Sequence, residues 1–131
     1  MTTGVIEKFL NHLKYLGYDI EEEDTGRFSA KHERLFNMCI SVKAGGIFFG
    51  AWVGGNEIAE THRQEFIERL NYLNGKAVVL RFHADEDSDL MIEAWYPKRY
   101  DRVSFAAFMD LLSRDSQLLF SDDYGVEKYC G

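Results

Sequence analysis

The sequence is poor in cysteine and proline and has no long apolar run, and these absences exclude several classes of protein. Its two cysteines, Cys39 and Cys130, form neither a CxxC pair nor a disulfide-dense framework, which is typical of a cytoplasmic protein with reduced thiols. No apolar run approaches the ~20 residues that cross a bilayer. The opening residues, MTTGVIEKFL, lack the basic start, apolar centre and cleavage site of a secretory signal. We therefore expect cytoplasmic localisation and no membrane partner.

Positive charge is also in short supply. Lys and Arg together number 15 against 22 Asp and Glu, which gives a formal net charge of -7 and a pI near 5.0. Binding to nucleic acid needs a basic surface that neutralises phosphates, so we expect no nucleic-acid partner. Hydrophobic residues make up 46% of the chain and aromatic residues 15%, a composition that indicates a folded domain and argues against disorder.

Three stretches have the apolar periodicity of amphipathic helices. The first ends near Leu16 and is followed by Gly17, a favoured residue after a helix C-terminus. The second is expected over residues 58–74, where the sequence THRQ (residues 61–64) matches a capping box. The third is expected over residues 103–119. The apolar stripes consist of Ile6, Phe9, Leu10, Leu13 and Leu16; Phe66, Ile67, Leu70 and Leu73; and Phe105, Phe108, Met109 and Leu112.

Five other stretches alternate between apolar and polar residues, as strands do. The acidic stretch at residues 18–26 has no such period, and we expect it to be a solvated connection. The element order αβββαββα predicts an α+β fold, an antiparallel five-stranded sheet with three helices on its more apolar face. We expect a single domain over residues 1–131, with a core over about 5–119 and a C-terminal tail over 120–131. The strands are expected at residues 27–32, 35–43, 47–55, 77–84 and 90–96.

The stretch HADEDSD, residues 83–89, is the most chemically suggestive part of the chain. Asp85, Asp87 and Asp89 have the spacing of the first three ligands of a calcium-binding loop. Such a loop also needs glycine at its sixth position and glutamate at its twelfth, where this sequence has Leu90 and Tyr96. The residues fit a solvated hairpin turn better than a metal site.

No motif in the sequence identifies a reaction or a cofactor. The histidines form neither an HExxH motif nor a pair at i, i+4, and Cys39 lies too far from Cys130 for a local zinc motif. There is no GxSxG motif and no phosphate-binding glycine loop. We therefore predict no catalytic residue, no cofactor and no metal ligand. The four histidines are His12, His32, His62 and His83.

The second face of the predicted sheet combines large apolar side chains with a few polar ones. Exposed aromatic groups of this size are unusual on monomers and are enriched at protein interfaces. The sequence allows two interpretations of this face: a helix covers it, or it is a dimer or partner surface. The candidate residues are Phe48, Trp52, Val79, Met91 and Trp95.

Three short patterns, together with the order of elements, resemble the YbjN-type family. They are LKYLGY (residues 13–18), ERLNYLN (residues 68–74) and FAAFMDLL (residues 105–112), and the resemblance spans roughly residues 6–119. It implies a fold like that of type III secretion chaperones, a small and often dimeric α+β domain that binds proteins in the cytoplasm. It brings no catalytic residues.

These observations predict a non-enzymatic protein-binding module, chaperone-like or a regulatory adaptor, that acts as a homodimer and recognises a protein segment. The alternative is a small enzyme or a ligand- or metal-binding domain that uses the acidic residues near Asp85–Asp89.

Overall fold

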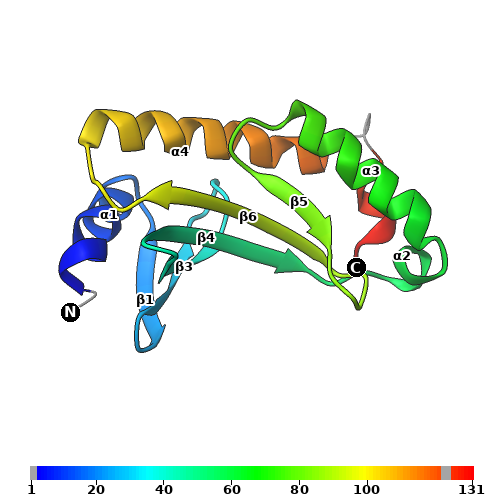
Figure 1. The fold of residues 1–131 in the computed structure, drawn as a ribbon, viewed down its shortest axis with the longest axis horizontal. Helices are drawn as coiled ribbons and strands as arrows, with labels where there is room; N and C mark the ends of the chain where they lie inside the picture. Colours follow the sequence, from blue (N-terminus) through cyan, green and yellow to red (C-terminus); the bar gives the residue numbers. More distant parts are fainter. Residues whose placement is uncertain (1–2, 122–124) are drawn as a thin grey trace.

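A computed structural model describes residues 3–121 and 125–131, which form one antiparallel sheet with helices on one side (Figure 1). The helices are α1 (Thr3–Tyr15), α2 (Glu57–Thr61), α3 (Arg63–Lys76) and α4 (Arg102–Ser116), with two 3-10 helices, η1 (Gln117–Phe120) and η2 (Glu127–Tyr129). The strands are β1 (Asp19–Asp24), β2 (Arg27–Lys31), β3 (Met38–Lys43), β4 (Gly46–Val53), β5 (Arg81–Ala84) and β6 (Leu90–Pro97).

The sheet has the spatial order β1-β2-β3-β4-β6-β5, and every neighbouring pair is antiparallel. The α+β class and the antiparallel sheet are therefore confirmed. β4 and β6, the two longest strands, lie side by side at residues from Gly46↔Pro97 to Val53↔Leu90. This long strand pair carries four of the five candidate surface residues.

The predicted strand count of five is wrong, because the acidic stretch expected to be a connection forms β1. Its residues pair with β2 from Asp19↔Lys31 to Asp24↔Arg27. β1 is an edge strand: its backbone pairs with β2 on one side only, and its carboxylates stay exposed to water. Charge of this kind masks the apolar alternation by which a strand is recognised in a sequence.

The predicted helix count of three is also wrong, because the expected helix over residues 58–74 is two helices. Asn56, rather than Thr61, caps the first: its side-chain oxygen accepts hydrogen bonds from the backbone N–H groups of Ile58 and Ala59. The Thr61 hydroxyl instead donates to the Glu57 carbonyl. The chain bends at His62, which separates α2 from α3.

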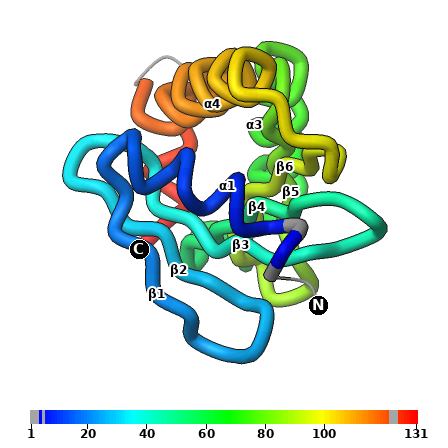
Figure 2. The backbone as a smooth tube through the Cα atoms, turned by 90° about the vertical axis from the view of Figure 1, so that its left-hand side faces the viewer, coloured from blue at the N-terminus to red at the C-terminus, as the bar shows by residue number. Residues whose placement is uncertain are grey.

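The hydrophobic core lies between one face of the sheet and the helices α1, α3 and α4 (Figures 1 and 2). Aromatic rings dominate its centre. Phe105 from α4 has its ring centroid 5.0 Å from that of Phe9 in α1, 5.3 Å from that of Tyr96 in β6 and 6.1 Å from that of Phe49 in β4. These contacts join two helices to the central strand pair, at separations typical of favourable ring pairs.

The C-terminal residues extend this core beyond position 119. Val126 and Tyr129 are fully buried, and the Tyr129 ring stacks on Phe66 of α3. The Tyr129 hydroxyl donates a hydrogen bond to the Glu65 carboxylate, and Lys128 forms an ion pair with the same carboxylate. The described residues 125–131 of the predicted tail thus pack against α3 through Tyr129 and Lys128 (Figure 1).

Candidate functional site

Four of the five candidate surface residues lie next to one another on the face of the sheet that none of the described helices covers. Phe48 and Trp52 point outward from β4, opposite Trp95 and Met91 of β6. Trp52 is 66% exposed and Trp95 is 47% exposed, whereas Phe48 and Met91 are half-buried. We call these four residues the aromatic face. The interpretation in which a helix covers them does not hold for the described part of the chain.

Trp95 is held in a fixed position on this face. Its indole Nε1–H donates a hydrogen bond of 2.8 Å to the Lys43 carbonyl. The ring also lies against Gly46, where a Cβ atom would come within 2.4 Å of two indole carbons. Glycine at this position lets the indole lie flat on the strand, so the exposed ring is ordered by contacts of its own.

Charged side chains lie beside and within the aromatic face. Lys43 Nζ lies 4.5 Å from the centre of the Phe48 ring, a cation–π contact. Glu93 lies between Met91 and Trp95 on β6. Its Oε1 forms an ion pair with the Arg81 guanidinium at 2.8 Å, and its Oε2 lies 3.5 Å from His83 Nε2. Burial alone would raise the pKa of Glu93, but the hydrogen bonds from Arg81 and His83 outweigh it and lower the pKa. The face therefore combines aromatic rings with charged side chains, because Glu93 lies between the two cross-strand pairs of large apolar residues.

Val79, the fifth candidate, lies outside the sheet, because β5 begins only at Arg81. The buried carboxylate of Asp115 in α4 accepts hydrogen bonds from the backbone N–H groups of Val78, Val79 and Leu80 at 2.9, 2.7 and 2.9 Å. These bonds hold residues 78–80 against α4 and keep them out of the strand ladder. The apolar alternation that predicted Val79 on this side of the sheet begins at residue 77, whereas the strand itself begins at Arg81.

Both edges of the sheet are protected against pairing with another strand. On β5, the Asn74 side chain forms two hydrogen bonds with the backbone of Phe82: its amide donates to the carbonyl at 2.9 Å, and its oxygen accepts from the N–H at 2.8 Å. On the opposite edge, β1 carries the acidic stretch. Occupied backbone groups and charge both disfavour strand addition. A partner is therefore better accommodated by the aromatic face than by an edge.

The acidic turn between β5 and β6 brings Asp85, Asp87 and Asp89 together, with one oxygen of each within 4.8 Å of the others. Hydrogen bonds account for this arrangement. Asp85 Oδ1 accepts from the backbone N–H groups of Asp87 and Asp89, and Asp89 Oδ1 accepts from that of Gly55. Arg63 also donates to the Asp85 carbonyl. Two of the three carboxylates thus stabilise the turn.

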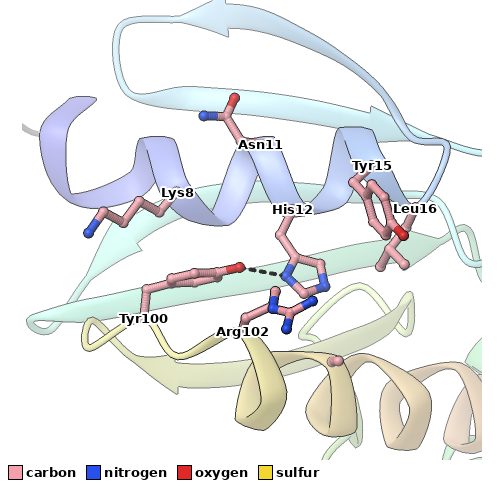
Figure 3. A pocket seen from close by; sticks show the side chains of 8 residues that line it. Lys8, Asn11, His12, Tyr15, Leu16, Tyr100 and Arg102 are labelled. Carbon is pink, nitrogen blue, oxygen red and sulfur yellow. Dashed lines mark hydrogen bonds between the residues drawn. The ribbon is translucent and has the colours of Figure 1, made fainter.

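A cavity of about 520 Å³ lies between α1 and the start of α4 (Figure 3). His12 lies at its centre, and its Nδ1 is 2.8 Å from the hydroxyl oxygen of Tyr100. Burial lowers the pKa of His12, and the nearby Arg102 guanidinium lowers it further. No pattern in the sequence indicates this site: residues 8, 12 and 15 share a helix face, but nothing in the sequence pairs that face with residues 100–106.

Two other residues considered in the sequence, His32 and Cys39, border these sites. His32 accepts hydrogen bonds from the backbone of Arg34 and Leu35 through Nδ1, and its Nε2 is 3.1 Å from the Leu16 carbonyl oxygen. These contacts give it a structural role. Cys39 is exposed on β3, opposite Gly50. None of the helices over the described residues is long and apolar enough to cross a membrane.

The geometry thus defines an α+β protein whose sheet is covered by helices on one side and displays ordered aromatic residues on the other. No protein-family model matches the sequence, and no curated protein matches it either. The fold is similar to the crystal structure of YbjN from E. coli, described as a proposed transcription regulator. The TM-score is 0.65 over 90% of this chain and 93% of that chain, at 15% sequence identity. The chain therefore has a YbjN-like fold, and at this identity the similarity establishes the fold alone.

Proposed function

We propose that this protein is a non-enzymatic binding module, chaperone-like or a regulatory adaptor, that uses the aromatic face to form a homodimer and to recognise a protein segment. The single observation that carries the proposal is the exposure of Trp52 and Trp95 on a sheet face that no described helix covers. Burying apolar area of this kind contributes about 25 cal/mol per Å², and tryptophan is among the residues that contribute most at interfaces.

The order of this face supports the proposal further. Trp95 is fixed by the Lys43 carbonyl and by its contact with Gly46, so a partner would meet a ring that has already lost its conformational freedom. Preorganised surfaces bind more tightly because less entropy is lost on association. The likeness to YbjN, a proposed regulator, agrees with a binding role and carries less weight than the geometry.

Sedimentation equilibrium of wild type, Trp52→Glu and Val103→Glu tests the homodimer. Val103 is the matched control because it is an apolar residue, 71% exposed, on α4 at the helix-covered side. We expect wild type and Val103→Glu to dimerise and Trp52→Glu to remain monomeric, because a buried unpaired charge is costly at an interface. Equal association of all three proteins, or a monomeric wild type, contradicts the homodimer.

Recognition of a protein segment is tested separately. Proteins captured by the wild type are identified by mass spectrometry, and one is purified and titrated against the same three variants. Loss of affinity with Trp52→Glu alone supports the aromatic face as the binding surface. Equal affinity of Trp52→Glu and wild type overturns that assignment.

The alternative, a ligand or metal site at the acidic turn, has weaker support, because Asp85 and Asp89 already bond to backbone N–H groups. Calorimetric titration with Ca²⁺ decides it. Saturable heat that disappears in Asp87→Asn would favour the alternative. Asp87 is suited to this test because it is the exposed member of the three carboxylates.

A further inference from the structure

The cavity between α1 and α4 is separate from the aromatic face and has a different chemistry. α1 contributes one wall, and the start of α4 with the preceding loop contributes the other (Figure 3). Its volume of about 520 Å³ is within the range of pockets that bind small molecules. The lining residues are Lys8, Asn11, His12, Tyr15, Leu16, Tyr100, Arg102 and Ala106.

The charge of this cavity is opposite to that of the whole protein. Lys8 and Arg102 line it, and none of the lining residues is acidic, although the chain has a net charge of -7. In Figure 3 the Arg102 guanidinium lies beside the His12 ring, whereas the Lys8 side chain extends away from His12, with Tyr100 between them. Two cations without a carboxylate between them create a local positive potential, which attracts an anion.

His12 adds a neutral hydrogen-bond donor to the two cations. Its ring is nearly buried and packs edge-on against Phe105, with ring centroids 5.0 Å apart. Because the Tyr100 hydroxyl can donate to Nδ1, the imidazole can keep its proton on Nε2, which has no hydrogen bond to any described residue. The depressed pKa agrees with a neutral ring. An acceptor atom of a ligand would complete the hydrogen bonding of Nε2–H.

The remaining walls of the cavity are apolar. Leu16, Ala106 and the ring of Tyr15 offer carbon surface beside the polar groups. A small inorganic anion would leave this surface exposed to water, whereas an organic anion would cover it. Arg102 presents a planar guanidinium, which matches a carboxylate in two parallel hydrogen bonds.

We propose that this cavity binds a small organic monocarboxylate, with the carboxylate between Arg102 and the Nε2–H of His12, and the apolar body against Leu16 and Ala106. The site does not depend on the aromatic face or on dimer formation. It would make the protein responsive to a metabolite of this class, whatever partner it binds.

Octanoate is a suitable probe, with octylammonium as the matched cation of similar length. We expect saturable 1:1 binding of octanoate by calorimetry, and chemical-shift changes at the His12 ring in NMR spectra of the full chain. Octylammonium should not bind there, because Lys8 and Arg102 repel it. Absence of saturable octanoate binding, or equal binding of both probes, would overturn the proposal.

Variants locate the binding site. Arg102→Gln should weaken octanoate binding about tenfold, the expected loss of one charge-assisted hydrogen bond. Lys8→Gln should weaken it less, because it only reduces the positive potential of the cavity. Both residues are exposed on helix surfaces, so the substitutions should not prevent folding, which circular dichroism verifies. Lys14→Gln is the control, since Lys14 is an exposed cation of α1 outside the cavity. Weakening by all three variants alike would indicate general charge attraction and exclude a specific site.

Discussion

The two faces of the sheet carry similar apolar residues and differ in what covers them. Along β4, Ile47 and Phe49 point toward the helices and are almost completely buried, while Phe48 and Trp52 point the other way. Trp52 keeps 66% of its surface exposed. The same strand therefore holds one set of aromatic residues that stabilises the fold and another that faces water.

The difference shows that burial in this protein is decided by the helices and not by the strands. Phe105 and Phe108 of α4 pack on Phe49, and no described element does the same for Trp52. The outer face is ordered by local contacts instead, such as the hydrogen bond from Trp95 to the Lys43 carbonyl. Substitutions on the two faces should therefore have separable effects on stability and on binding.

The largest effect is expected from Phe49→Ala on the helix-covered face. Removing a buried ring that contacts Phe105 and Phe108 leaves a cavity, and the free energy of unfolding should fall by ~3–5 kcal/mol. Urea denaturation followed by far-UV circular dichroism measures the change. A loss below about 1 kcal/mol would mean that this face is loosely packed, and the contrast between the two faces would disappear.

A smaller loss is expected from Gly46→Ala, which tests the ordered ring of the outer face. The new Cβ would lie 2.4 Å from Trp95 Cε2 and 2.6 Å from the Tyr96 carbonyl oxygen. Relieving this overlap should cost about 1–3 kcal/mol and displace the Trp95 indole. The indole N–H resonance reports the displacement.

The control for this substitution is Gly75→Ala in α3, where an added Cβ meets no atom within 4 Å. Alanine is the better helix former, so stability should stay the same or rise by up to about 1 kcal/mol. If Gly46→Ala were equally harmless, Trp95 would not be held against β4 as the structure describes.

Acidification should weaken the helix side through Glu65, which bonds to Tyr129 and Lys128. The hydrogen bond from Tyr129, and then that from Lys128, lower the pKa of Glu65 from 4.5 to about 2. A depressed pKa stabilises the fold at pH values above 4.5, and this stabilisation is lost as the pH falls from 4.5 toward about 2. Urea midpoints of wild type and Glu65→Gln should therefore differ at pH 7 and converge near pH 2. A constant difference between them across this window would contradict the assignment.

Much of the fold could be predicted because β3, β4 and β6 alternate clearly and the helices have distinct apolar stripes. The exceptions have physical causes. β1 is an acidic edge strand without apolar alternation. The helix after β4 is interrupted at His62 although its apolar period continues. Tyr129 becomes part of the core through a contact with Phe66 that no local pattern encodes.

The candidate sites were predictable to different degrees. Alternation alone placed Phe48, Trp52, Met91 and Trp95 on one face, because side chains two residues apart share a side of a strand. It could not indicate whether a helix covers that face, which depends on the topology. The cavity around His12 was not predictable, since its two walls come from opposite ends of the sequence.

The smallest effect on stability is expected from Trp52→Ala, the counterpart of Phe49→Ala in the same strand. An exposed side chain without a described hydrogen bond contributes little to the folded monomer, so the free energy of unfolding should change by no more than about 0.5 kcal/mol. Urea denaturation at a protein concentration below that of dimer formation measures this value. At higher concentrations the wild type should gain stability and Trp52→Ala should not, because only association through the aromatic face adds to the folded state. A large loss at low concentration would show that Trp52 belongs to the core and would make the two faces equivalent.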